Sequence, residues 1–221
     1  MEIDKIVRSR RRTFALIVGR DATLTVRAPH RASEAEIRAL VRIKSAWILR
    51  KQEDARKTFT EFAPKKFTEG ETFLYLGKKY ELFVGENSAV PLELGEKFVL
   101  SKKYVGREAG VFLKWYRRRA LEHISERVKT HSASAGLRPG MVKVNGALKR
   151  WGSCAAAGNL NFAWRLVMAP PEVVDYVVLH ELSHLVHKNH SKRFWENVRA
   201  LQPDYKANKK WLKDHGHLLS L

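Results

Sequence analysis

The pattern of apolar and polar residues begins with alternation, which predicts sheet structure at the start of the chain. Residues 6–18 and 23–28 alternate around Gly19-Arg20-Asp21, which is the pattern of a two-stranded hairpin. Farther along, residues 73–84 and 91–100 are rich in apolar and aromatic side chains and are punctuated by glycines. We expect these later segments to form short antiparallel strands.

A helix is predicted after the hairpin, from about residue 34 to residue 56. Ser33 is a suitable N-cap, and Glu34 and Glu36 lie in the first turn, where the helix dipole favours acidic side chains. Apolar residues then recur at helical spacing: Ile37, Leu40, Val41, Trp47 and Ile48. This helix is expected to be amphipathic, with a basic outer face.

A second, longer helix is predicted from about Arg107 to Ala133. Its side chains form one row at four-residue spacing, which places them on a single face: Phe112, Tyr116, Ala120, Ile124 and Val128. Gly136 and the Pro139-Gly140 pair should end the helix, because both favour turns over continued helix.

The segment after the second helix is predicted to form two strands and then a third helix. Residues 141–153 and 160–167 have strand character and are joined through the Gly158-Asn159 turn. The Pro170-Pro171 pair suits a first helical turn, where the missing amide hydrogen of proline has no partner to lose. The valines that follow would suit a strand equally well. The helix prediction therefore rests on the proline start, the acidic residues near it and the motif that follows.

That motif is His180-Glu181-Leu182-Ser183-His184, which has the form H-E-x-x-H. On a helix, residues four apart project from one face about 6 Å apart along the axis, so both imidazoles can bind one metal ion. Glu181 is offset by about 100° and can reach a metal-bound water without being a ligand. The alternative, in which these residues decorate a solvated helix face, is disfavoured because valine and leucine surround them.

A catalytic zinc site takes a third protein ligand and keeps one position open. The candidates after the motif are His187, His190 and Glu196. His187 lies about 10 Å along the axis from His180, too far for one ion to join all three histidines on a straight helix. Residues 188–191 supply a suitable helix stop and the cap of a new helix, so a turn there can fold His190 back. We expect His190 to be the third ligand, with Glu196 as the alternative.

Composition is that of a folded protein. Hydrophobic residues make up 44% and aromatic residues 10% of the 221 positions, which excludes a disordered chain. Cys154 is the single cysteine, which excludes an internal disulfide framework and a cysteine-rich zinc module. No apolar run approaches the roughly 20 residues that span a bilayer, and residues 2–12 are charged with no signal-peptide core after them. We therefore expect a cytoplasmic protein.

The charge of the chain is strongly basic and introduces further hypotheses. Lys and Arg number 42 against 23 Asp and Glu, for a formal net charge of +19. Residues 171–221 are nearly neutral, so the excess lies in residues 1–170, where Trp47, Trp115 and Tyr116 are interleaved with basic residues. Such a surface can attract DNA or RNA, although a merely well-solvated basic surface explains the same composition. One alternative is therefore a nucleic-acid-binding protein whose metal site is structural or vestigial. Another is a peptidase that acts on nucleic-acid-associated proteins.

Several motifs together resemble those of the YgjP-like metallopeptidases. In the carboxyl half the matching stretches are residues 150–154 (RWGSC), 158–161 (GNLN), 180–185 (HELSHL), 189–191 (NHS) and 194–195 (FW). In the amino half they are residues 8–11, 26–29 and 76–78, so the likeness covers most of the chain. The family is similar in turn to SprT-like and Spartan-like proteases, which act on proteins associated with DNA. The resemblance implies that His180, His184 and His190 bind zinc and that Glu181 is the general base.

The strands before the metal helix are candidates for substrate binding. In zinc proteases an extended substrate commonly pairs with an edge strand beside the metal, so that main-chain hydrogen bonds hold the scissile carbonyl near the ion. We assign this role to Trp151, Gly152, Ser153 and Asn161. Trp151 and Cys154 fit a packed core equally well, and no independent feature activates Cys154 as a nucleophile or a ligand.

The resulting prediction is an α+β protein with a zincin-like metallopeptidase core of a long helix, a small antiparallel sheet and the H-E-x-x-H helix. We expect a basic, β-rich amino-terminal region with one amphipathic helix at residues 1–104, and the metallopeptidase domain at residues 105–221. The predicted activity is hydrolysis of peptides or proteins by a zinc-bound water, with Glu181 as general base and one zinc per chain. The residue that supports the oxyanion is left open among Arg150, Arg165 and Tyr176.

Overall fold

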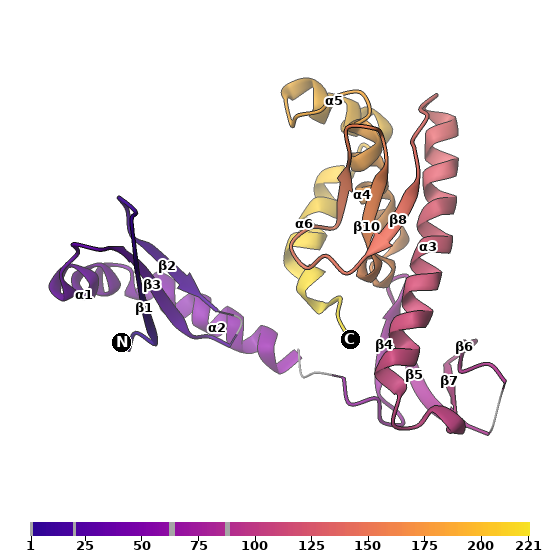
Figure 1. Ribbon diagram of the computed structural model, residues 1–221, viewed down its shortest axis with the longest axis horizontal. Coiled ribbons are helices and arrows are strands. Elements are labelled where there is room, and N and C mark those ends of the chain that lie inside the picture. Colours follow the sequence, from indigo (N-terminus) through magenta and orange to yellow (C-terminus); the bar gives the residue numbers. More distant parts are fainter. Residues whose placement is uncertain (1, 20, 62–64, 87–88) are drawn as a thin grey trace. The chain divides into compact units, whose positions relative to one another are not determined.

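The computed structural model describes residues 2–19, 21–61, 65–86 and 89–221 (Figure 1). The chain divides into two compact units, Met1–Pro64 and Lys65–Leu221, which we call the N-terminal unit and the C-terminal unit. This boundary lies well before the expected one at residue 104, because the strands that precede residue 104 share a core with the long helix after it. No helix in the described part of the chain is long and apolar enough to cross a membrane.

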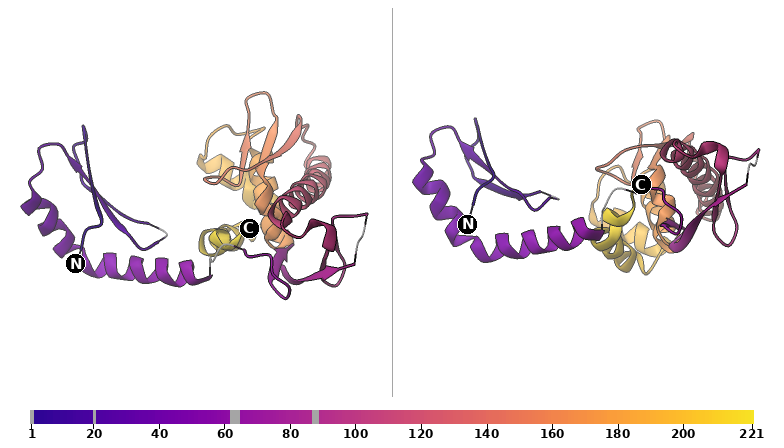
Figure 2. Two further views of the ribbon diagram at one scale, coloured as in Figure 1. Left: turned by 60° about the horizontal axis from the view of Figure 1, so that its bottom comes forward. Right: turned by 90° about the horizontal axis from the view of Figure 1, so that it is seen from below.

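The N-terminal unit is a three-stranded sheet with two helices on one side of it (Figure 2). Its elements are β1 (Lys5–Ser9), β2 (Ala15–Val18), β3 (Leu24–Pro29), α1 (Glu34–Ile43) and α2 (Ser45–Glu61). The central strand β3 pairs antiparallel with β2, as the expected hairpin does, and parallel with β1. The expected first strand is split, because the chain turns after β1, where the Arg11 amide donates to the Ser9 carbonyl. Arg20, in the predicted hairpin turn, lies outside the described residues.

The start of α1 matches the capping signals of the sequence. Ser33 Oγ accepts from the Glu36 amide at 3.2 Å, and Glu36 Oε2 accepts from the Ser33 amide at 2.7 Å, so both halves of a capping box are formed. The single helix expected here is interrupted at Lys44, which caps α1 with φ −98° and ψ 11°. The core of this unit is aliphatic and joins the sheet to both helices: Leu24, Val26, Ala28, Ile37, Val41 and Ile48.

The C-terminal unit contains two sheets and the remaining helices. Its elements are β4 (Thr72–Tyr75), β5 (Lys78–Gly85), β6 (Leu92–Leu94), β7 (Phe98–Ser101), η1 (Lys102–Tyr104), α3 (Glu108–Ser134), β8 (Val142–Asn145), β9 (Gly152–Cys154), β10 (Leu160–Ala163), η2 (Trp164–Met168), α4 (Pro171–Ser183), α5 (Lys192–Leu201), α6 (Tyr205–His215) and η3 (Gly216–Leu218). The first sheet has the order β4-β5-β7-β6. Its outer pairs are antiparallel as expected, but β5 and β7 are parallel, because the chain passes to the edge strand β6 before it returns as β7.

The first sheet packs against α3 through aromatic side chains. The ring centroid of Phe112 lies 4.3 Å from that of Phe73 and 5.2 Å from that of Phe98. The Tyr116 hydroxyl donates to the Leu74 carbonyl at 2.6 Å, which attaches β4 to the same helix. These contacts place residues 65–104 in the core of the C-terminal unit.

The long helix α3 begins and ends within a residue of its predicted bounds. The predicted row of apolar side chains is fully or almost fully buried: Phe112, Tyr116, Ala120, Ile124 and Val128. Arg127 forms a two-bonded ion pair with Asp175 of α4, with Nε–Oδ1 and Nη2–Oδ2 distances of 2.6 and 2.8 Å. The helix is thus joined to α4 by both packing and a charge pair.

The second sheet, β8-β10-β9, is mixed rather than wholly antiparallel. The predicted strand at residues 141–153 is two strands, which flank β10 on opposite sides: β8 pairs with β10 parallel and β9 pairs with it antiparallel. The predicted strand at residues 160–167 ends early, and Val167 lies in the turn η2. The carbonyls of Val167 and Met168 accept from the amides of Leu76 and Gly77 at 2.8 and 3.2 Å. Residues 164–168 therefore contact the β4–β5 turn instead of extending the strand.

The predicted third helix is confirmed as α4. Pro171 lies in its first turn, and the valines that would also suit a strand are buried on several sides of it: Val173, Val174, Val177 and Val178. The helix contacts α3, α5, α6 and β9. An apolar helix with partners on all sides explains why its sequence carries little amphipathic signal.

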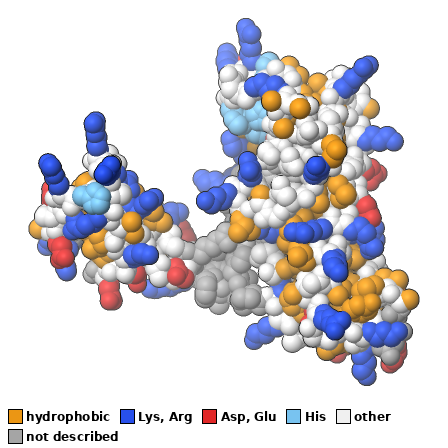
Figure 3. Space-filling model, in the orientation of Figure 1, with side chains coloured by type: hydrophobic (Ala, Val, Ile, Leu, Met, Phe, Trp, Pro, Cys, Tyr) orange, Lys and Arg blue, Asp and Glu red, His pale blue; other side chains and the backbone are white. Residues whose placement is uncertain are grey.

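Basic side chains are spread over both units. Figure 3 shows Lys and Arg across the visible face of each unit rather than gathered in one patch. Some have acidic neighbours on the same helix: Arg38 lies 3.8 Å from Glu34, and Lys51 lies 3.5 Å from Asp54. The charge excess expected in residues 1–170 is therefore distributed over much of the molecule.

Candidate metal centre

The carboxyl end of α4 carries the H-E-x-x-H motif. His180 and Glu181 lie in the last turn, and His184 occupies the C-cap position. The His180 and His184 ring centroids lie 5.1 Å apart, so both imidazoles are on one face as the spacing predicts.

The third histidine reaches this face because the chain reverses after α4. The predicted helix stop and restart lie between α4 and α5, and Asn189 Oδ1 accepts from the Ser191 amide at 3.2 Å within that turn. His190 Nε2 lies 3.0 Å from His180 Nε2. One ligand atom from each of His180, His184 and His190 lies within 4.8 Å of the others. The structure therefore brings together the three predicted ligands.

The other two candidate ligands lie outside this cluster. The carbonyl of His187 is 3.0 Å from His184 Nδ1, and since a carbonyl only accepts, Nδ1 is the protonated nitrogen of His184. This bond leaves Nε2 of His184 with its lone pair free for a metal. Glu196 is exposed and lies 3.8 Å from Lys192 on α5. His187 thus supports the cluster through its backbone, and Glu196 takes no part in it.

The cluster fits a metal ion in both donor type and protonation. Burial, together with the charges of His184, His190 and Lys209, lowers the pKa of His180 to about 3. Burial also lowers the pKa of His190. Neutral imidazole is the form that binds metal, so these surroundings favour the ligand state. The ring of Phe194 packs against all three imidazoles, with centroid distances of 4.5–4.9 Å.

Glu181 is a buried carboxylate in a restricted space. It is 5% exposed, and its Oε2 has no hydrogen-bond partner among the described residues. Burial raises its pKa to about 7, although the charge of Arg150 acts in the opposite direction. A Cβ added at Gly152 of β9 would lie 2.5 Å from Glu181 Oε1. The glycine of the predicted strand is therefore what leaves room for the carboxylate.

The predicted substrate-binding residues lie on β9 or beside it. In the second sheet β9 is an edge strand, and Gly152 faces Glu181. Trp151 precedes the strand, and its carbonyl accepts from the Ala163 amide at 2.8 Å. Ser153 pairs with Asn161 of the central strand β10. The structure thus places three of the four residues at the edge and Asn161 one strand behind it.

Cys154 and the three candidates for oxyanion support differ in their surroundings. Burial raises the pKa of the Cys154 thiol, which agrees with an unactivated cysteine. Arg165 is engaged elsewhere, because its Nη2 donates to the Ala147 carbonyl at 2.8 Å. Tyr176 and Arg150 both line a pocket beside the histidines. Burial raises the pKa of Tyr176 to about 12, so its hydroxyl keeps its proton.

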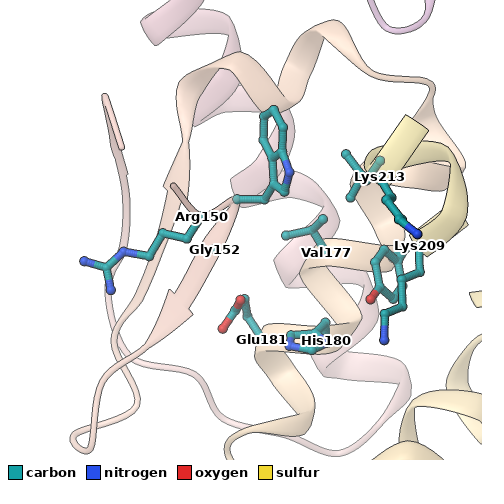
Figure 4. Close-up of a pocket in the computed structure, with 10 residues that line it drawn as sticks. Arg150, Gly152, Val177, His180, Glu181, Lys209 and Lys213 are labelled. Carbon is teal, nitrogen blue, oxygen red and sulfur yellow. The ribbon is translucent and has the colours of Figure 1, made fainter. Parts of the chain in front are cut away.

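This pocket has a volume of about 340 Å³ and lies between β9, α4 and α6 (Figure 4). Sequence reasoning missed its third wall, which α6 supplies with Lys209, Leu212 and Lys213. The spacing of these residues predicts one face of a helix, but nothing in the sequence indicates that this face meets the metal helix.

Comparisons with known proteins indicate the family of this chain. The chain matches the model of the YgjP-like metallopeptidase domain family over residues 12–215. No curated protein matches it. Two solved structures resemble part of it. The metallopeptidase zymogen abylysin of Pyrococcus abyssi is 20% identical, with 41% of this chain and 92% of that chain covered and a TM-score of 0.38. The metallopeptidase zymogen jannalysin of Methanocaldococcus jannaschii is 19% identical, with 39% and 90% covered and a TM-score of 0.36. These structural scores are too low to carry an argument, whereas the family model spans most of the chain, and the protein therefore belongs to the YgjP-like metallopeptidase family.

Proposed function

We propose that the protein is a zinc-dependent peptidase of the H-E-x-x-H type, with His180, His184 and His190 as ligands and Glu181 as general base. The observation that carries this proposal is the convergence of three imidazoles next to a buried carboxylate oxygen that has no partner among the described residues. A purely structural metal site has no need of such a carboxylate, so its presence favours an enzyme over a structural site.

The donor set supports zinc and an open coordination position. Three imidazoles, with no fourth protein ligand among the described residues, are typical of catalytic zinc sites. When bound, zinc would act as a Lewis acid that acidifies a water molecule and polarises the substrate carbonyl. The bond from His184 Nδ1 to the His187 carbonyl fixes the tautomer that such an ion requires.

Glu181 is proposed to move the proton. Its carboxylate is held between α4 and the backbone of Gly152, which restricts its orientation. A pKa near 7 allows the group to accept a proton from the attacking water and to release it to the leaving nitrogen at neutral pH. Burial also keeps bulk water from competing for the same proton.

The edge strand β9 is proposed to orient the substrate. Its one partner strand among the described residues is β10, so its other edge has no strand beside it. An extended peptide pairing there would pass Trp151, Gly152 and Ser153, with the scissile bond close to Glu181. Asn161 would contribute indirectly, because it lies on the neighbouring strand β10 and pairs with Ser153.

Metal analysis of purified variants tests the ligand assignment. We expect about one zinc per chain in the wild type and in Glu196→Ala, and a loss of bound zinc in His190→Ala, because His190 belongs to the histidine cluster and Glu196 does not. Glu196→Ala is the matched control, since it removes the alternative ligand from the neighbouring helix. Stoichiometric and equally tight zinc in His190→Ala would overturn the assignment of the third ligand.

A further inference from the structure

The pocket beside the histidines has apolar walls. Val177 of α4 and Leu212 of α6 face it together with the rings of Trp151 and Tyr176. Its volume of about 340 Å³ lies at the lower end of the roughly 300–1000 Å³ that ligand pockets span. It is therefore large enough for one side chain or for the end of a peptide.

Charge is distributed unevenly across this pocket. Glu181 lies at one side of the pocket and Lys213 of α6 at the other, and the side chain of Lys209 reaches from α6 toward His180 (Figure 4). The two lysines are four residues apart, so they share one face of α6. Glu181 is the one acidic residue in the described lining. The guanidinium of Arg150 points away from the lysines, so the positive side of the pocket is formed by α6 (Figure 4).

The two pocket lysines differ from their neighbour on the same helix. Lys210 lies 2.6 Å from Asp214, which compensates its charge. Among the described residues, no carboxylate lies within 4 Å of Lys209 or Lys213. The Lys209 ammonium instead lies 4.2 Å from the ring centroid of Trp195, which holds its side chain beside the metal-binding end of the molecule.

We propose that this pocket is a subsite for a carboxylate group of the substrate, held by Lys209 and Lys213. The carboxylate is either an acidic side chain next to the scissile bond or the carboxyl terminus of the peptide. Repulsion by Glu181 orients the ligand, with its carboxylate toward α6 and its scissile carbonyl toward the histidines. This inference rests on the proposed function, because the histidines and Glu181 define the reacting end.

Equilibrium binding to zinc-loaded Glu181→Gln protein tests the subsite without turnover. The probe is a decapeptide library that carries Glu, Gln, Lys or Leu at one central position, prepared both with an amidated and with a free carboxyl terminus. Mass spectrometry quantifies the bound peptides. We expect the Glu peptides to be enriched about tenfold over the Gln peptides if the side chain is the source, and the free acids over the amides if the terminus is the source. The preference should weaken at high salt.

Charge reversal assigns the preference to α6. Lys209→Glu with Lys213→Glu should abolish the carboxylate preference and favour the Lys peptides. The matched control, Lys206→Glu with Lys210→Glu, makes the same change of charge on the same helix away from the pocket and should keep the wild-type preference. Three outcomes would overturn the proposal. The first is equal binding of Glu and Gln peptides with no effect of the terminus, and the second is enrichment of Leu peptides above Glu peptides. The third is a carboxylate preference that persists after charge reversal at Lys209 and Lys213.

Cleavage of the same library by the zinc-loaded wild type separates the two hypotheses. Carboxylate-selective binding without cleavage of any member would contradict the proposed peptidase and leave the subsite intact. Cleavage without a preference for Glu or for a free terminus would support the peptidase and contradict the subsite.

Discussion

The two units share an α+β character and a basic surface, but their interiors differ. The core of the N-terminal unit consists of small and aliphatic side chains, and no titratable group is buried within it among the described residues. The core of the C-terminal unit is rich in aromatic rings, and beside it Glu181 and His180 are withdrawn from water. Burial of a charged group costs free energy, so a unit that tolerates it usually gains function in return. Among the described residues, the buried titratable groups that could carry chemistry therefore lie in the C-terminal unit.

Two glutamates show the same contrast. Glu36 accepts two hydrogen bonds from Ser33 at a helix start, and these bonds lower its pKa. Glu181 has an oxygen with no partner among the described residues, and burial raises its pKa to about 7. The first carboxylate stabilises a helix as an ion, whereas burial makes the second carboxylate easier to protonate.

The largest expected effect is that of Glu181→Gln. The amide has nearly the same shape but cannot accept the proton, so kcat/KM for peptide cleavage should fall by about 10²–10⁴ while the zinc content stays unchanged. Glu36→Gln is the matched control, because it makes the same change in the N-terminal unit and should leave cleavage unaltered. Wild-type turnover by Glu181→Gln would remove this residue from the mechanism.

Core truncations test whether the units act separately. Phe112→Ala should destabilise the C-terminal unit by about 3–5 kcal/mol and reduce both zinc retention and cleavage, because Phe112 of α3 packs against the first sheet. Ile37→Ala should destabilise the N-terminal unit by about 2–5 kcal/mol with cleavage unchanged. Urea titration followed by metal analysis measures both. Equal losses of cleavage in the two variants would contradict the division.

Metal removal should also act on one unit. A free zinc concentration of about 100 times the dissociation constant stabilises a fold by about 2.7 kcal/mol. Chelation should therefore lower the melting temperature of the C-terminal unit. Hydrogen exchange followed along the chain should change around α4 and α5 and not in β1 to β3. An equal loss of protection in both units would show that the metal supports the whole chain.

Local signals were sufficient to predict much of this fold. The capping box at Ser33, the buried row along α3 and the proline start of α4 all lie within one or two turns of helix, and each is confirmed. The position of His190 was predictable from local signals as well. One helix ends and the next begins within a few residues, so the chain reverses direction there and brings His190 back to the first two histidines.

Long-range pairings were not predictable from the same signals. Nothing local distinguishes β5 pairing with β7 from β5 pairing with β6, and the parallel partners of β3 and β10 lie beyond intervening segments. The boundary between the two compact units was not predictable for the same reason, because Phe73 and Phe98 have strand character but nothing in the sequence indicates that they pack against α3. The α6 wall of the pocket was not predicted either. Helix periodicity indicates which residues share a face of α6, but not which part of the protein that face contacts.

A smaller effect is expected from Gly152→Ala. The added Cβ would lie 2.5 Å from Glu181 Oε1, so the carboxylate must shift while the three histidines stay in place. We expect kcat to fall by about 10–100-fold with the zinc content unchanged. Gly110→Ala on α3 is the control, because its Cβ would meet no atom within 4 Å and alanine favours helix. Equal activity of the two variants would show that the space beside Glu181 is not needed.

The smallest effect is expected from the basic surface, and it tests whether the N-terminal unit binds a partner. Binding to DNA or RNA should weaken steeply as salt rises, because each neutralised phosphate releases counterions. Reversal of charge at Arg38, Arg42 and Lys51 should weaken that binding without a change in zinc content, since all three lie outside the C-terminal unit. The effect should be modest, because Arg38 and Lys51 already have acidic neighbours at 3.8 and 3.5 Å. Titration of labelled single-stranded and duplex DNA at low and at physiological salt measures it. An absence of saturable binding at low salt would remove nucleic acid from the partners and leave the contrast between the units to rest on the metal centre alone.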